Sequence, residues 1–105
     1  MNSEAIAKDK VDAWFAQWTT LQAAIHTAHD ARNGLAKGLM EEAIELFEQL
    51  VQAAGDEVLP INGGVERLAF IKAKPGQYAC YRQLDELFKE TKKRTARLRI
   101  QASKS

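Results

Sequence analysis

Residues 11–28 read VDAWFAQWTTLQAAIHTA, and their apolar side chains recur every three or four residues. The repeat runs through Val11, Trp14, Trp18, Leu21, Ile25 and Ala28. This spacing places side chains on one face of an α-helix. Because neither glycine nor proline occurs from Ser3 to Asn33, the pattern predicts a long amphipathic helix over 3–33. Ser3 is its candidate N-cap, and Asn33-Gly34 offers a left-handed stop.

A second amphipathic helix is predicted from Leu35 or Gly38 to Ala54, where Gly55 follows. Its apolar side chains share one face, and its outward positions are acidic. The acidic residues are Glu41, Glu42, Glu45 and Glu48. The link between the two helices is short, so they are expected to form an antiparallel hairpin.

The C-terminal part begins after a turn-rich loop, residues 55–64. Segment 65–73 suits a short helix. A β-hairpin over 65–82 is the alternative, since Phe70 and Ile71 precede a Pro75-Gly76 turn. Four consecutive apolar residues, 68–71, break the alternation that a half-exposed strand needs, which favours the helix. From about 77 to 101 the periodicity is again helical.

These elements predict an all-α fold, a small helical bundle forming one domain over 1–105. An α+β fold with the hairpin at 65–82 is the alternative. A helix over 3–33 spans about 45 Å, whereas a compact chain of this length is only about 33 Å across. The first helix therefore kinks, belongs to an elongated fold, or meets another chain.

The composition fits a soluble single-core protein. Of the 105 residues, 46% are hydrophobic and 28% are charged, which argues against disorder. A single cysteine excludes an intrachain disulfide framework and is typical of a reducing compartment. The first ten residues lack a signal-peptide pattern, and no stretch has the length of a membrane span. The expected location is the cytoplasm, without membrane contact.

The net charge of +1 conceals two opposite parts. Residues 1–57 contain ten acids and four bases, whereas 58–105 contain eleven bases and four acids. The loop 55–64 thus separates an acidic helical hairpin, 3–54, from a basic part, 65–102. Such a dipole can attract a polyanion at one end or a second copy head to tail.

Residues 89–104 carry seven bases and one acid on the last predicted helix. The candidate contacts are Lys89, Lys92, Lys93, Arg94, Arg97 and Arg99. They fit DNA or RNA phosphates, with hydroxyl contacts from Thr91 and Thr95. They also fit an acidic protein surface. A third reading is that they pair with the glutamates of the second helix or simply face water.

The aromatic residues Trp14, Phe15 and Trp18 have two readings. An aromatic stripe at helical spacing usually fills a core. The alternative is a protein interface, most simply in a homodimer, that covers the overhanging helix.

Two groups could carry chemistry. His26, His29 and Asp30 lie at metal-ligand spacing on one helix, but an ordinary surface interaction between His26 and Asp30 is the favoured reading. Cys80 is either a packed small hydrophobe or a nucleophile, and the histidines are not its sequence neighbours. No catalytic residue, metal or cofactor is assigned.

The sequence therefore predicts a non-enzymatic regulatory or adaptor protein that binds a protein partner or itself. Nucleic-acid binding through the basic helix is the first alternative. A small metal-dependent enzyme using His26, His29 and Asp30 is the second.

Overall fold

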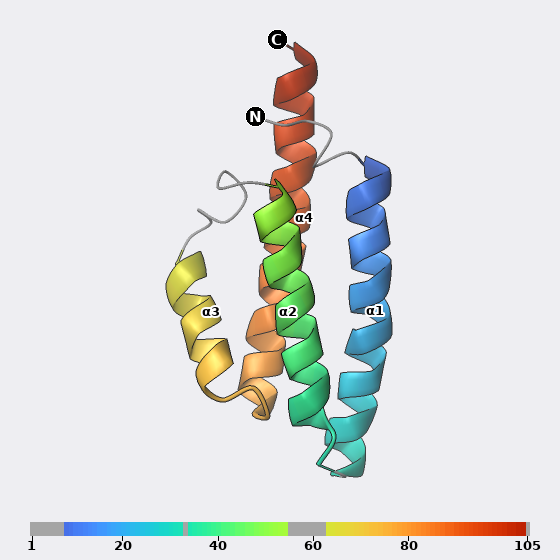
Figure 1. Ribbon diagram of the computed structural model, residues 1–105, viewed down its shortest axis with the longest axis vertical. Helices are drawn as coiled ribbons and strands as arrows, with labels where there is room; N and C mark the ends of the chain where they lie inside the picture. Colours follow the sequence, from blue (N-terminus) through green and yellow to red (C-terminus); the bar gives the residue numbers. More distant parts are fainter. Residues whose placement is uncertain (1–7, 33, 55–62, 105) are drawn as a thin grey trace.

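The computed structural model describes residues 8–32, 34–54 and 63–104. Within these ranges the chain forms four helices and no strand (Figure 1). Their bounds are Lys8–Ala31 (α1), Ala36–Ala54 (α2), Gly64–Ala73 (α3) and Tyr78–Lys104 (α4). The all-α prediction is confirmed, and the β-hairpin alternative over 65–82 is wrong because α3 and the start of α4 occupy those residues.

The turn between α1 and α2 uses left-handed backbone on both sides of Asn33. Arg32 has φ 51° and Gly34 has φ 79°, so the chain reverses within a few residues. Asn33 itself, like the proposed N-cap Ser3, lies outside the described residues. The short reversal makes α1 and α2 the predicted antiparallel hairpin (Figure 1).

The helical choice in segment 65–73 follows from its packing. Gly63 precedes the helix with φ 68°, a left-handed conformation that glycine adopts without strain. Gly64 and Ile71 are buried, while Leu68 packs at the core edge. These residues share one helical face, whereas in a strand they would not all point to one side. The apolar run 68–71 covers both faces of α3, since Ile71 is buried and Phe70 is exposed.

The helices form an elongated bundle with principal extents of 50 × 26 × 16 Å. In Figure 1, α4 runs antiparallel to α1 and passes behind α2, and α3 flanks α4. The 27 residues of α4 make it the longest helix of the described chain, about 40 Å at the usual rise per residue. Its last turns extend beyond the first turn of α1 (Figure 1). Elongation thus accommodates helices that exceed the width of a compact globule.

The core centres on Phe88 of α4, which is fully buried. Its ring stacks on Trp18 with centroids 4.3 Å apart and meets Phe15 and Phe47 edge to face. These partners come from α1 and α2, so one aromatic cluster joins three helices. Ile71 brings α3 into the same core.

No helix in the part of the chain that the structure describes combines the length and the apolarity needed to cross a lipid bilayer.

Candidate functional site

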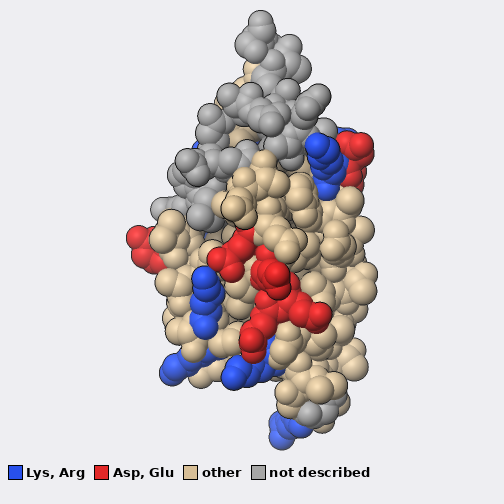
Figure 2. Space-filling view, viewed as in Figure 1, with Lys and Arg blue, Asp and Glu red and all other residues tan. Residues whose placement is uncertain are grey.

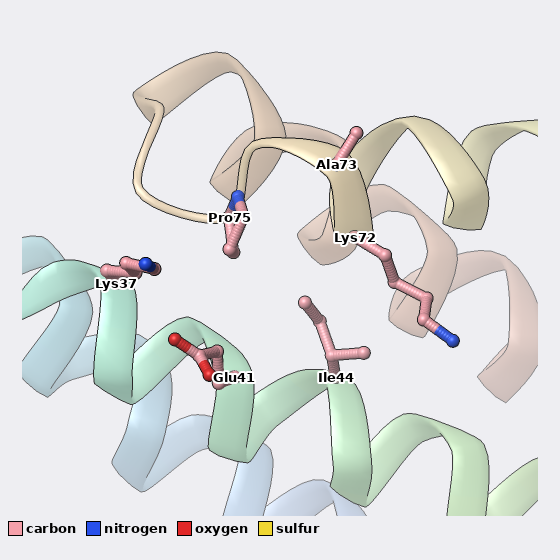
Figure 3. Close-up of a pocket in the computed structure, with 6 residues that line it drawn as sticks. All are labelled: Lys37, Glu41, Ile44, Lys72, Ala73 and Pro75. Carbon is pink, nitrogen blue, oxygen red and sulfur yellow. The ribbon is translucent and has the colours of Figure 1, made fainter.

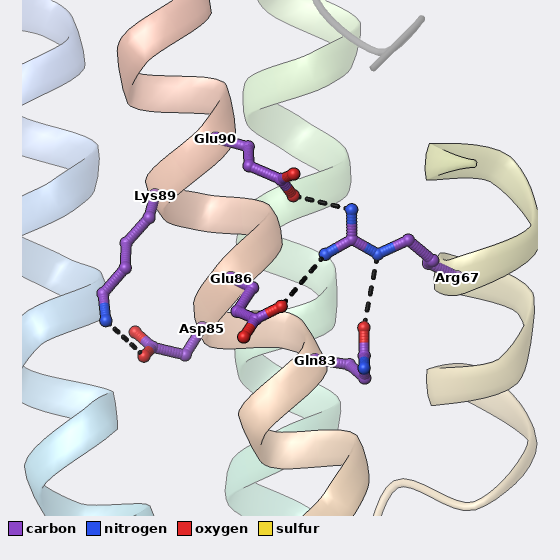
Figure 4. Close-up of polar contacts among 6 residues, drawn as sticks. All are labelled: Arg67, Gln83, Asp85, Glu86, Lys89 and Glu90. Carbon is purple, nitrogen blue, oxygen red and sulfur yellow. Dashed lines mark hydrogen bonds and ion pairs between the residues drawn. The ribbon is translucent and has the colours of Figure 1, made fainter. Parts of the chain in front are cut away.

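The acids of the first half of α4 are held in ion pairs (Figure 4). The Arg67 guanidinium of α3 lies 2.6 Å from a Glu90 oxygen and 3.6 Å from a Glu86 oxygen. Its Nε donates to Gln83 over 3.2 Å. A planar guanidinium has several N–H donors, so it can contact three side chains at once. Arg67 thereby fixes α3 to α4 and neutralises much of the acidic charge of α4.

The remaining acid of α4, Asp85, is also engaged. Lys89 Nζ lies 2.9 Å from one Asp85 oxygen, and the Gln22 amide of α1 donates to the other over 3.0 Å. The hydrogen bond to Asp85 raises the pKa of Lys89 above its ordinary value. Of the candidate contact residues, Lys89 is therefore partly neutralised within its own helix.

The second half of α4 has a different surface. From Thr91 onward the helix contains no acidic residue, and we call its five bases on residues 92–99 the basic segment. They are Lys92, Lys93, Arg94, Arg97 and Arg99. Lys93 and Arg97 are exposed, and no carboxylate of the described ranges lies within ion-pair distance of either. Arg94 and Arg99 are half-buried.

The basic segment is anchored to the beginning of α1. Lys92 Nζ lies 5.5 Å from the centroid of the Phe15 ring, a cation–π arrangement. The pKa of Asp12 is lowered, first by the hydrogen bond from Lys8 and further by the charges of Lys92 and Arg99. Asp12 therefore offsets part of the charge of Lys92 and Arg99.

Thr91 and Thr95 are not available to a phosphate. Both are fully buried in the core face of α4, and the Thr95 hydroxyl donates to the backbone oxygen of Lys92 over 2.9 Å. The prediction that they supply hydroxyl contacts is therefore wrong. Their spacing continues the apolar stripe of α4, where a threonine methyl group packs like a small hydrophobe.

The glutamates of α2 do not neutralise the basic segment. Glu48 pairs with Lys72 of α3 at 3.2 Å, and no ion pair between described residues joins α2 to α4. The acids gather on the face that α2 presents to the viewer in Figure 2, whereas α4 passes behind α2 in Figure 1. The described glutamates of α2 therefore form no ion pair with the basic segment.

The three aromatic residues of the proposed protein interface have different environments. Phe15 and Trp18 are buried in the chain's own core, with 9% and 3% of their surface exposed. Trp14 is half-buried and borders a shallow hollow of about 400 Å³ with Lys10 and Gln17. Only Trp14 of the three remains accessible enough to take part in a contact with another molecule.

The histidine cluster does not converge. His26 Nε2 lies 3.4 Å from an exposed Asp30 oxygen, whereas the His29 ring meets the Tyr78 ring edge to face at 5.2 Å. No group of three or more potential metal ligands occurs in the described part of the chain. The surface interaction between His26 and Asp30 is therefore confirmed, whereas His29 points to different surroundings.

Cys80 is a packed hydrophobe, one of the two sequence readings. Its side chain is fully buried, its thiol lies 3.9 Å from the Phe70 backbone oxygen, and burial raises its pKa. A thiol with a raised pKa holds little thiolate near neutral pH, so it is a poor nucleophile.

The fold and this surface define a class: a small helical protein with one strongly cationic helix end. Residues 8–103 match the model of the family described as YpoC-like protein, and the chain belongs to this family. No curated protein and no solved structure matches the chain.

Sequence reasoning missed Arg67, whose contacts decide which charges of α4 remain. Arg67 is one base among many, and its partners lie 16 to 23 residues away on another helix. The turn at 74–77 sets this register, and no local spacing rule could have indicated it.

Proposed function

We propose that the protein is a non-enzymatic regulatory or adaptor protein that binds nucleic acid through the basic segment of α4. The observation that carries the proposal is the contrast in pairing along this helix. The acids of its first half are engaged by Arg67 and Lys89, while Lys93 and Arg97 project without a carboxylate partner among the described residues. An unneutralised run of cations is the requirement for contact with a polyanion.

The shape of the basic segment supports the same proposal. Lys93 and Arg97 lie four residues apart, about 6 Å along the helix axis. A duplex carries one phosphate charge for every ~1.7 Å of its axis, so a straight ridge of cations meets several phosphates at once. The last turns of α4 extend past the first turn of α1 (Figure 1).

Nucleic acid is favoured over an acidic protein because the segment lacks an apolar anchor at its centre. Protein interfaces combine charge with a buried apolar core, whereas the large hydrophobic residue exposed near the basic segment is Ile100 at its edge. The segment also contains no aromatic side chain for base stacking. We therefore propose backbone contacts that do not depend on sequence.

The proposal of binding rather than catalysis rests on the chemical groups already described. The buried Cys80 has a raised pKa, and His26 and His29 face different partners. These groups support no shared reaction centre.

The test is an anisotropy titration of labelled single- and double-stranded DNA and RNA at about 50 and 200 mM salt. We expect binding that weakens steeply with salt. The variant Lys92→Gln/Lys93→Gln/Arg97→Gln is expected to lose most of the affinity. The control Arg32→Gln/Lys37→Gln/Lys74→Gln removes the same net charge from exposed residues outside α4 and is expected to bind nearly normally. Equal losses in both variants, or no binding at low salt, would contradict the proposal.

A further inference from the structure

The second feature of the surface is a groove between α2 and α3. Its wider hollow, about 400 Å³, lies between Lys37, Glu41 and Ile44 of α2 and Lys72, Ala73 and Pro75 of the opposite wall (Figure 3). The apolar side chains of Ile44 and Pro75 face this hollow, while charged groups border it (Figure 3). It is therefore amphipathic, with an apolar floor and a polar rim.

A second hollow of about 270 Å³ lies further along the same two helices. Val51 of α2 and Leu68 of α3 supply its apolar surface, and Glu48 and Gln52 border it. Ile44 and Val51 are seven residues apart, which is two helical turns or about 10.5 Å. We call the two hollows together the α2–α3 groove.

One ion pair spans the walls of the groove. Lys72 Nζ lies 3.2 Å from a Glu48 oxygen, and the two side chains are 52% and 44% exposed. Exposed pairs of this kind contribute little to stability and exchange partners readily. The pair therefore does not close the groove to a ligand that offers Glu48 another cation.

Carboxylates on the α2 side of the groove repel each other, and a bound cation would reduce this repulsion. Glu41 lines the wider hollow, and Glu45 follows it four residues later on α2 without lining either hollow. Both are exposed and have no cationic partner within ion-pair distance in the described ranges. Like charges at this spacing destabilise their own helix. Figure 2 shows the acids gathered over α2 on the face that contains the groove.

We propose that the α2–α3 groove binds a basic amphipathic helix of a partner protein. Two apolar side chains of this helix, seven residues apart, enter the hollows at Ile44 and Val51, and its lysines or arginines face Glu41 and Glu45. Helix-in-groove recognition uses anchors at this spacing. Lys37 and Lys72 also line the wider hollow, but the exposed glutamates of α2 disfavour nucleic acid on this face. The apolar stripe of α4 is already buried in the core, so a second copy does not supply such a helix.

The probe is a designed, end-capped peptide of about 16 residues, long enough for measurable helicity. It carries leucines at positions seven apart, flanking lysines and alanine elsewhere, and its control has serine in place of both leucines. We expect the leucine peptide to bind with a dissociation constant on the order of 10–100 µM. It should shift the amide resonances of Val51 and Leu68, and the serine peptide should not bind.

Two matched pairs of variants locate the contact. Glu41→Lys, in the groove, should weaken peptide binding at least about threefold, whereas Glu42→Lys, which lines neither hollow, should leave it unchanged. Val51→Asp should abolish binding, and Val65→Asp, at an exposed position of α3, should not. Should Val51→Asp reduce helix content, the glutamate pair still decides.

Three results would overturn the proposal: no binding of the leucine peptide at about 1 mM, equal binding of the serine peptide, or equal effects of Glu41→Lys and Glu42→Lys. The basic segment is on another helix. Glu41→Lys is therefore expected to retain nucleic-acid binding, and each proposal can fail without the other.

Discussion

The two halves of α4 share one buried stripe but present opposite surfaces. In the first half, Phe88 joins the aromatic cluster and Arg67 and Lys89 hold the acids. In the second half, buried threonines continue the stripe, and the exposed Lys93 and Arg97 have no carboxylate within ion-pair distance among the described residues. The comparison shows that the two halves of one helix can share a buried face and still differ in the charge that they expose. Both halves contribute side chains to the core, and we propose that the exposed bases of the second half meet a ligand.

The largest expected effect comes from the first half. Phe88→Ala removes the ring that contacts Trp18, Phe15 and Phe47, so we expect a loss of about 3–5 kcal/mol in the free energy of unfolding. Urea denaturation followed by circular dichroism measures it. The comparison variant Thr95→Val fills the same stripe in the second half and should change stability much less. A similar loss in both variants would show that the two halves do not differ in this way.

Charge reversal in the second half of α4 should reduce nucleic-acid binding and leave the stability nearly unchanged. Lys93→Glu/Arg97→Glu is expected to reduce nucleic-acid affinity by about 100-fold, or 2.7 kcal/mol. The melting temperature should hardly change because both side chains are exposed and unpaired among the described residues. Anisotropy and thermal melting of the same sample check the two expectations. A large drop in melting temperature would mean that these residues stabilise the bundle.

Arg67 pairs with acids of the first half of α4, Glu86 and Glu90, which precede the basic segment. Arg67→Met leaves Glu86 and Glu90 without their cation. We expect a loss of about 1–2 kcal/mol in stability, since the carboxylates remain partly solvated. The released carboxylates lie one or two turns before Lys93, so nucleic-acid affinity should also decrease. Arg67→Lys is the control, because lysine keeps the positive charge but lacks the planar guanidinium that contacts several side chains at once. If Arg67→Met left both stability and affinity unchanged, the pairing of these acids would have no role.

The smallest expected effect is a dependence on alkaline pH. Burial raises the pKa of Cys80 above its ordinary value of 9.0 and that of Tyr81 above 10.0. The folded protein retains protons that the unfolded chain releases, so these two groups should lower the stability increasingly as the pH rises above about 9. Cys80→Ala should flatten the first part of this decrease. Denaturation at about pH 8 and pH 10.5 tests the sign, and increasing stability toward high pH would contradict it.

Helical periodicity was sufficient to predict the bundle because each long helix carries a continuous apolar stripe. The Val11–Ala28 repeat and the Tyr81–Leu98 repeat both became core faces, with Leu84, Phe88 and Thr91 fully buried. Segment 65–73 was ambiguous because a short helix that is apolar on two faces lacks a clear period. Its packing on α4 decides the conformation, and sequence spacing contains no information on that contact.

The candidate site was predicted in part. The run of bases is visible in the sequence, but which of them remain unpaired depends on Arg67, Asp12 and Asp85, which lie on three helices. Thr91 and Thr95 were predicted to contact phosphates because they carry hydroxyls. Their positions in the apolar repeat of α4 instead predict that they are buried. The α2–α3 groove was missed entirely, since a hollow arises from the spacing between helices and leaves no local pattern.

The central claim is that the second half of α4 is the nucleic-acid contact. The most direct measurement is a titration of isotope-labelled protein with a duplex of about 16 base pairs at low salt, followed by amide resonances. We predict shifts concentrated on Lys92 to Ile100, with the first half of α4 and the acidic face of α2 unaffected. Shifts concentrated on Arg32, Lys37 and Lys74, or no shifts at all, would contradict the account.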